Sequence, residues 1–138
     1  NYPGVVATQA DVAELMKSDD ASVRLFAAQA TEDWNPARLL KVYEPAIARA
    51  KELGLQLYCG EFGSMPTVPR TARLAYYRDI VGVFEANGIA WANWEYKGDF
   101  GIFQWNGAKD SIGAPDVEII DALMQRDASC CNASACKK

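Results

Sequence analysis

The spacing of apolar residues changes along the chain, and these changes predict the secondary-structure elements. Apolar positions recur every three or four residues after Asn35, after Arg70 and after Pro115, which is typical of helices with one buried face. Continuous apolar runs over 55–63 and 89–96 are instead typical of strands, the first of them buried on both faces. The order helix, strand, helix, strand, helix predicts an α/β fold in which both strands run parallel.

Capping signals predict where the longest helix begins and ends. Asn35 as N-cap and Pro36 at the first helical position begin a helix over 36–53, and Gly54 ends it as a C-cap. Pro45 interrupts this helix and should kink it. The stripe expected to be buried consists of Leu39, Val42, Tyr43, Ile47 and Ala50.

Shorter signals predict the remaining helices. Thr8 and Asp11 resemble a capping box for a helix over about 9–17, and a second helical pattern follows around 23–26. Another helix ends at Asn87-Gly88, and a last one begins at Pro115-Asp116. Their expected buried stripes are Leu74, Tyr77, Ile80, Val81 and Phe84 in the former, and Val117, Ile120, Leu123 and Met124 in the latter.

Composition narrows the functions open to the chain. The formal net charge is −4 and Lys and Arg form no run, which argues against a nucleic-acid partner. No apolar stretch approaches the roughly 20 residues that span a bilayer, so no membrane partner is expected. Histidine is absent, which removes the usual base of serine and cysteine hydrolases and the commonest zinc ligand. Acid–base chemistry must therefore come from carboxylates, Tyr, Lys or Cys, and no cofactor is expected.

Cysteine spacing gives no support for a metal site. Cys59 lies inside the first expected strand, whereas Cys130, Cys131 and Cys136 lie close together near the end of the sequence. Because paired Cys-x-x-Cys spacing is missing, a disulfide within this end, or none, is favoured over a zinc site. Small and polar residues dominate beyond Arg126, so residues 127–138 are expected to form a flexible tail.

A carboxylate stands at the end of the first expected strand. The sequence Gly60-Glu61-Phe62-Gly63 places Glu61 at the carboxyl end of the strand, where parallel α/β folds gather their chemistry. Gly60 and Gly63 lack a Cβ, so another backbone or a ligand can approach closely. A solvated glutamate that begins an ordinary loop explains this pattern equally well.

A large aromatic residue ends the next strand. If the two strands are neighbours, Trp94 and Glu61 can flank one mouth, and a carboxylate beside a flat ring is typical of a sugar site. Core packing is the alternative for Trp94. Lys97, on the loop that follows, could donate a hydrogen bond to a substrate hydroxyl or simply face solvent.

Glycoside hydrolysis normally requires a second carboxylate. Strict alternation turns Glu95 to the opposite face from Trp94 unless the strand has already ended, and Asp99 is typical of a solvated loop residue. Trp34 and Trp105, on presumed loops, could extend a saccharide groove or pack beneath the loops. The sequence therefore offers no convincing acid partner for Glu61.

Two motifs, in this order, resemble one enzyme family. The segments 57–63 and 88–101, with an Arg-bearing segment and an apolar helix between them, resemble the C-terminal part of the cellulase family, glycoside hydrolase family 5. The resemblance covers roughly residues 36–124. It implies an α/β fold that is the C-terminal portion, about strands 7 and 8 with flanking helices, of a (β/α)8 TIM barrel. Residues 1–126 would then be a partial glycoside hydrolase catalytic domain.

The resemblance also implies a function. The family cleaves β-1,4-glucans or related β-glycans with retention of configuration, and Glu61 matches its nucleophile. Trp94 matches the eighth-strand tryptophan beneath the sugar, and Lys97 falls where some members contact substrate. The family's Asn-Glu pair, which carries the acid/base, has no counterpart here.

Chain length supports the interpretation as a fragment. Barrels of this kind take at least about 200 residues, and this chain has 138. The isolated chain is therefore expected to be inactive, and the parent enzyme to be secreted and to act on β-glucan or a related polysaccharide. The alternative is a non-catalytic carbohydrate-binding half-barrel that self-associates through unpaired sheet edges.

Overall fold

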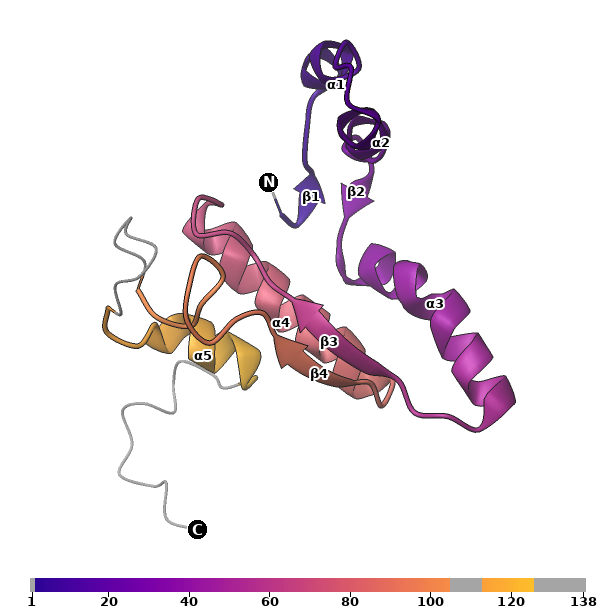
Figure 1. Ribbon diagram of the computed structural model, residues 1–138, viewed down its shortest axis with the longest axis vertical. Coiled ribbons are helices and arrows are strands. Elements are labelled where there is room, and N and C mark those ends of the chain that lie inside the picture. Colours follow the sequence, from indigo (N-terminus) through magenta and orange to yellow (C-terminus); the bar gives the residue numbers. More distant parts are fainter. Residues whose placement is uncertain (1, 105–112, 126–138) are drawn as a thin grey trace.

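The computed structural model describes residues 2–104 and 113–125, which form a mixed α/β arrangement (Figure 1). Trp105 and the tail from residue 127, with its three cysteines, lie outside the described residues. The elements are β1 Gly4–Val5, α1 Gln9–Leu15, α2 Ala21–Gln29, β2 Asp33–Trp34, α3 Pro36–Leu53, β3 Tyr58–Phe62, α4 Arg70–Ala86, β4 Ala90–Asn93 and α5 Val117–Leu123.

The capping signals lie where the sequence predicted them. Thr8 accepts a hydrogen bond from the Asp11 N–H and the Asp11 side chain accepts one in return, so the capping box of α1 is confirmed. The Asn35 side chain accepts from the Arg38 N–H at the start of α3. Gly54 ends α3 in the left-handed conformation, at φ 64°, which costs glycine little because it has no Cβ.

Helices α3 and α4 bury most of the stripes that the sequence predicted. In α4, Tyr77, Ile80, Val81 and Phe84 are buried, and Leu74 is partly buried. In α3, Leu39, Ile47 and Ala50 are buried and Tyr43 is partly buried, but Val42 is exposed. The prediction for Val42 was wrong because α3 packs mainly on α4, which covers a narrower part of its surface than the predicted stripe.

The predicted face of α5 is confirmed for Leu123, which is buried, and wrong for Val117 and Met124; Ile120 is partly buried. Val117 and Met124 are exposed, and the buried residues are Ile119, Ala122 and Leu123, with Asp121. A seven-residue helix has too few turns to define its face from periodicity alone. The face is instead fixed by packing against α4 and by the Asp116 cap.

The strands β3 and β4 pair in parallel, as the sequence predicted. Tyr58 lies opposite Ala90, Cys59 opposite Trp91 and Phe62 opposite Asn93, with an irregularity of register between Cys59 and Phe62. A second, antiparallel pair joins β1 and β2. Within residues 2–104 and 113–125 these are two separate two-stranded sheets and no closed barrel is present.

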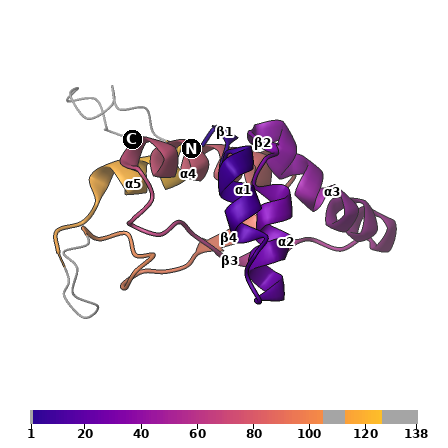
Figure 2. The same ribbon diagram turned by 90° about the horizontal axis from the view of Figure 1, so that it is seen from above.

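Burial of the first strand on both faces is not observed. Phe62 is buried, at 8% exposure, whereas Tyr58 is 67% exposed and Leu55, ahead of the strand, is exposed as well. Helix α4 lies against one face of the β3–β4 pair (Figure 2). No element of the described chain covers the opposite face, so residues that point that way remain open.

Aromatic rings pack the end of β3 against α4 and β4. The Phe62 ring lies 5.3 Å from that of Phe84, 5.6 Å from that of Trp91 and 6.3 Å from that of Tyr77, centre to centre. These edge-on contacts are the favoured geometry for aromatic pairs. The interpretation of Tyr77 and Phe84 as core residues is confirmed, and the position of the strand end is fixed by this cluster.

Residues 2–34 form an arm that stands away from the β3–β4 pair (Figure 1). The two helices expected there are present as α1 and α2. Tyr2 of this arm contacts α4: its hydroxyl donates to Asp79 at 2.8 Å, and its ring lies edge-on to the Tyr76 ring. Neither these helices nor any other in the described part of the chain is long and apolar enough to cross a membrane.

Candidate active site

Glu61 is the next-to-last residue of β3 and is exposed. Because adjacent side chains of a strand point to opposite faces, burial of Phe62 against α4 turns Glu61 toward the uncovered face. Within the described residues, no hydrogen bond or ion pair engages its carboxylate. The carboxylate is thus held by a fixed strand end and is free to meet a ligand.

Trp94 follows β4 directly and is 49% exposed. The backbone N–H of Trp94 donates to the carbonyl oxygen of Phe62 at 2.7 Å, so the Trp94 backbone lies beside the residue that follows Glu61. Parallel pairing therefore brings Glu61 and Trp94 to the same edge of the sheet. The core alternative for Trp94 does not hold in this structure, since half of its surface is open.

Gly63 allows this close approach. A Cβ at Gly63 would lie 2.3 Å from the carbonyl oxygen of Trp94 and 3.0 Å from the Phe100 ring, so no larger residue fits without movement. The prediction that another backbone approaches this glycine is confirmed. At Gly60, an added Cβ would meet only the Tyr58 ring, at 3.4 Å, which is an ordinary contact. The space around Gly60 therefore does not require a glycine.

The polar residues beyond β4 do not supply an obvious acid. Since β4 ends at Asn93, the alternation that would turn Glu95 away from Trp94 does not apply. The Glu95 carboxylate nevertheless folds over its own loop, because a Cβ at Gly98 would lie 2.3 Å from one of its oxygens. Lys97 is exposed and Asp99 is partly buried. Lys97 forms no ion pair with the described residues.

Trp34 does not present an open sugar platform. The Arg38 guanidinium lies over the Trp34 ring, with its central carbon 4.6 Å from the ring centre. The indole N–H of Trp34 donates to the carbonyl oxygen of Gln29 at 3.3 Å. The indole thus packs within the junction of β2 and α3. Of the two explanations open for Trp34, the structure favours packing.

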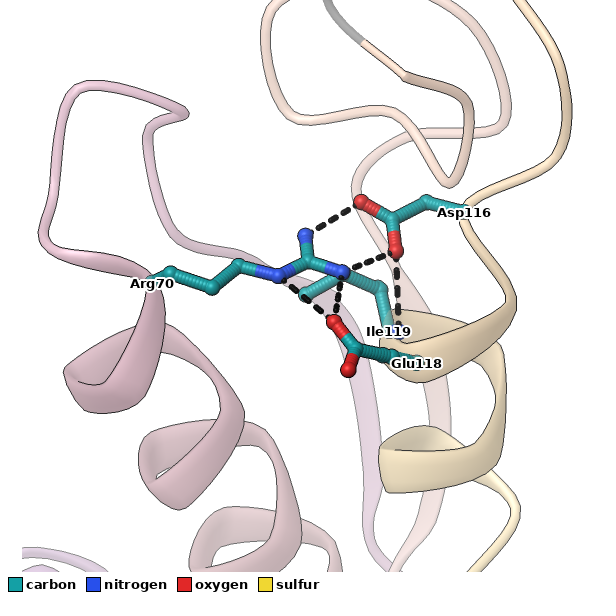
Figure 3. Close-up of polar contacts among 4 residues, drawn as sticks. All are labelled: Arg70, Asp116, Glu118 and Ile119. Atoms are coloured by element: carbon teal, nitrogen blue, oxygen red, sulfur yellow. Dashed lines mark hydrogen bonds and ion pairs between the residues drawn. The ribbon is translucent and has the colours of Figure 1, made fainter. Parts of the chain in front are cut away.

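An ionic cluster that the sequence did not reveal joins α4 to α5 (Figure 3). Arg70 donates through both terminal nitrogens to Asp116, with 2.5 Å between Nη2 and Oδ1, and through Nε to Glu118 at 3.0 Å. Asp116 also accepts from the Ile119 N–H at 3.2 Å. Burial disfavours the charged form of Asp116, but these hydrogen bonds outweigh it and lower its pKa.

The described residues contain no group of three or more acidic or cysteine side chains placed to hold a metal ion. The arrangement at this end of the sheet consists of a free carboxylate and an open indole, and Lys97 is exposed on the loop that follows. Such a set can pack against a sugar ring and place a nucleophile beside it.

Comparisons with known proteins point to one class of enzyme. No family model matches the chain. Over 70 residues it is 34% identical to endoglucanase C of Acetivibrio thermocellus, a match that covers 50% of this chain and 20% of that protein. The chain thus spans only a small part of the curated relatives that it matches.

Solved structures match about two thirds of the chain. Cellulose synthase subunit Z of Clostridioides difficile matches with a TM-score of 0.56 and 27% identity, over 64% of this chain and 28% of that one. Cel5A of Thermotoga maritima matches with a TM-score of 0.54 and 20% identity, over 64% of this chain and 27% of that one. These neighbours are TIM-barrel enzymes matched over part of this chain. The resemblance to the cellulase family, glycoside hydrolase family 5, is confirmed.

Proposed function

We propose that this chain is a fragment of a retaining endo-β-glycanase that hydrolyses β-1,4-linked polysaccharide, with Glu61 as its nucleophile. Similarity to endoglucanases supports a cellulase-like glycoside hydrolase. The observation that carries the proposal for Glu61 is its free carboxylate on the same sheet edge as the open Trp94 indole. Trp94 would pack beneath the sugar, and Lys97 would donate to a substrate hydroxyl.

The proposed chemistry uses two steps. The Glu61 carboxylate attacks the anomeric carbon as an acid protonates the departing oxygen, and water then cleaves the glycosyl ester with the same acid acting as base. In retaining enzymes the two carboxyl groups stand about 5–5.5 Å apart. No described residue of this chain is suitably free and placed, since Glu95 folds over its own loop. We therefore assign the acid/base to a part of the enzyme outside this chain.

The uncovered sheet face supports the same proposal. In a TIM barrel the inner face of each strand packs against the other strands, while helices cover the outer face. Glu61 is exposed and points to the side opposite the buried Phe62, and Tyr58 is 67% exposed on a strand whose register is irregular between Cys59 and Phe62. We propose that β3 and β4 are strands 7 and 8 of such a barrel and that the parent enzyme is secreted, because its polymeric substrates lie outside cells.

The activity of the 138-residue chain tests the fragment assignment. Assayed on a soluble β-glucan, the purified chain is expected to show no turnover, because the acid/base is lacking. The Glu61→Gln variant serves as the matched control for contaminating glycosidase. Turnover by the wild-type chain that this variant lacks would overturn the assignment.

A second candidate function is binding without cleavage by a self-associated half-barrel. It is favoured by the exposed aromatic side chains Tyr58, Trp94 and Tyr96 and by the outer edges of β3 and β4, which remain unpaired among the described residues. Sedimentation distinguishes the two candidates. A stable folded dimer that is retained on insoluble cellulose favours this second function, whereas a chain that neither dimerises nor is retained on cellulose favours a fragment.

A further inference from the structure

A cavity of about 350 Å³ lies next to the loop that follows β3. Neither Glu61 nor Trp94 belongs to its walls. Its size is at the lower end of the range of ligand pockets, about 300–1,000 Å³, so it suits a small molecule. The residues that line it are Pro66, Val68, Arg70, Arg73, Gln104 and Asp116.

Arg73 is the unusual member of this lining. Its side chain is buried, with 6% of the residue exposed, and its Nε is fully buried without a hydrogen-bond partner. None of the ion pairs within residues 2–104 and 113–125 includes it. Its guanidinium lies 6.0 Å from the centre of the Tyr77 ring, at the outer limit of a cation–π contact. A buried N–H without an acceptor is costly, and no described residue supplies an acceptor for this Nε.

The carboxylate in the cavity wall is already in use. Asp116 Oδ1 accepts from Arg70 Nη2 and from the Ile119 N–H, and Oδ2 accepts from Arg70 Nη1 (Figure 3). The neighbouring Glu118 also accepts from Arg70. Both acids therefore form their hydrogen bonds with Arg70. Arg73 lies near enough to Asp116 to favour its charged form, but it donates no hydrogen bond and forms no ion pair within the described residues.

We propose that this cavity binds the carboxylate of a small organic acid, with the Arg73 guanidinium as its donor. The planar guanidinium presents parallel N–H groups that match a carboxylate. A single negative charge balances the Arg73 cation, which forms no ion pair with the described residues, whereas a dianionic phosphate would meet stronger repulsion from Asp116. The Gln104 amide, in the same lining, adds both donor and acceptor capacity for hydroxyl groups. This site is independent of the role proposed for Glu61.

Thermal unfolding of the 138-residue chain with two matched sugars tests the site. D-glucuronate supplies a carboxylate, and D-glucose with sodium chloride at equal ionic strength serves as the control. A ligand that binds only the folded state raises Tm with its concentration. We expect a saturable rise in Tm with glucuronate and none with glucose. An equal response to both sugars, or no response to either, would overturn the proposal.

Two variants in α4 test whether Arg73 is responsible for the rise in Tm with glucuronate. Arg73→Met should abolish the response to glucuronate, and Arg78→Gln, at an exposed position of α4, should keep it. Without ligand, Arg73→Met should raise Tm, because an apolar side chain of similar length replaces an unpaired buried charge. A lower Tm of ligand-free Arg73→Met would show that Arg73 already has its partner, and would contradict the proposal.

Discussion

The exposure of Glu61 is a consequence of the residue beside it. Phe62 packs its ring among Tyr77, Phe84 and Trp91, which fixes the strand and directs the preceding side chain to the opposite face. A nucleophile needs such a rigid support, because a catalytic group must be held close to its productive position. The structure thus gives Glu61 a fixed backbone and a free carboxylate.

Substitution of Gly63 tests the packing behind this edge. Gly63→Ala would place a Cβ 2.3 Å from the Trp94 carbonyl oxygen, so β3 and the loop after β4 must separate. We expect a loss of about 1–3 kcal/mol in the free energy of unfolding, measured by urea denaturation.

Gly82 in α4 provides the control for that substitution. An added Cβ there has no atom within 4 Å, so Gly82→Ala should stabilise the chain by about 0.5–1 kcal/mol through helix propensity. If Gly63→Ala were as stable as the wild type, the close approach of Trp94 would be contradicted.

Part of the candidate site could be predicted from the sequence. Parallel strands end at one edge, so the proximity of Glu61 and Trp94 followed from their positions at successive strand ends. The Arg70–Asp116 pair joins residues 46 positions apart, and no periodic pattern links them. Arg73 was likewise missed, because its burial depends on how α4 packs.

Among the helices and strands, the ends were predicted reliably from local sequence signals, whereas the buried faces were not. The caps Thr8, Asn35 and Gly54 act within one helical turn, so the residues themselves determine them. The exposed face of β3 and the buried face of α5 depend instead on what packs against them. Periodicity could not identify those partners.

The cluster that joins α4 to α5 should make stability depend on pH. Hydrogen bonds from Arg70 and the Ile119 N–H outweigh the effect of burial and hold the pKa of Asp116 below its usual value. A carboxyl of this kind stabilises the fold fully above its unfolded-state pKa, about 3.9. That contribution is lost as pH falls through the lower folded-state pKa.

Asp116→Asn tests this dependence. At neutral pH the variant should lose about 1–3 kcal/mol of unfolding free energy, because a buried acceptor for Arg70 is weakened. Below about pH 4 the difference from wild type should shrink, since only the wild type loses the ionic contribution. Urea unfolding at a series of pH values measures both effects. A difference that stays constant with pH would contradict the role of Asp116.

At the scale of the whole molecule, two features have one explanation under the proposed function. The β3–β4 pair has an uncovered face and unpaired outer edges within the described chain, and the chain matches only 28% of the length of a solved relative. Closure into a barrel removes exposed edges and covers inner faces. Further strands from a longer protein would pair the outer edges of β3 and β4 and cover their open face.

Covalent trapping in a complete enzyme that contains this chain identifies the nucleophile. A 2-deoxy-2-fluoro β-glycoside slows hydrolysis of the glycosyl ester, so the labelled peptide can be identified by mass spectrometry. We expect the label on Glu61, its loss in Glu61→Gln and its retention in Glu95→Gln. A label on any other carboxylate would contradict the assignment of Glu61 as nucleophile.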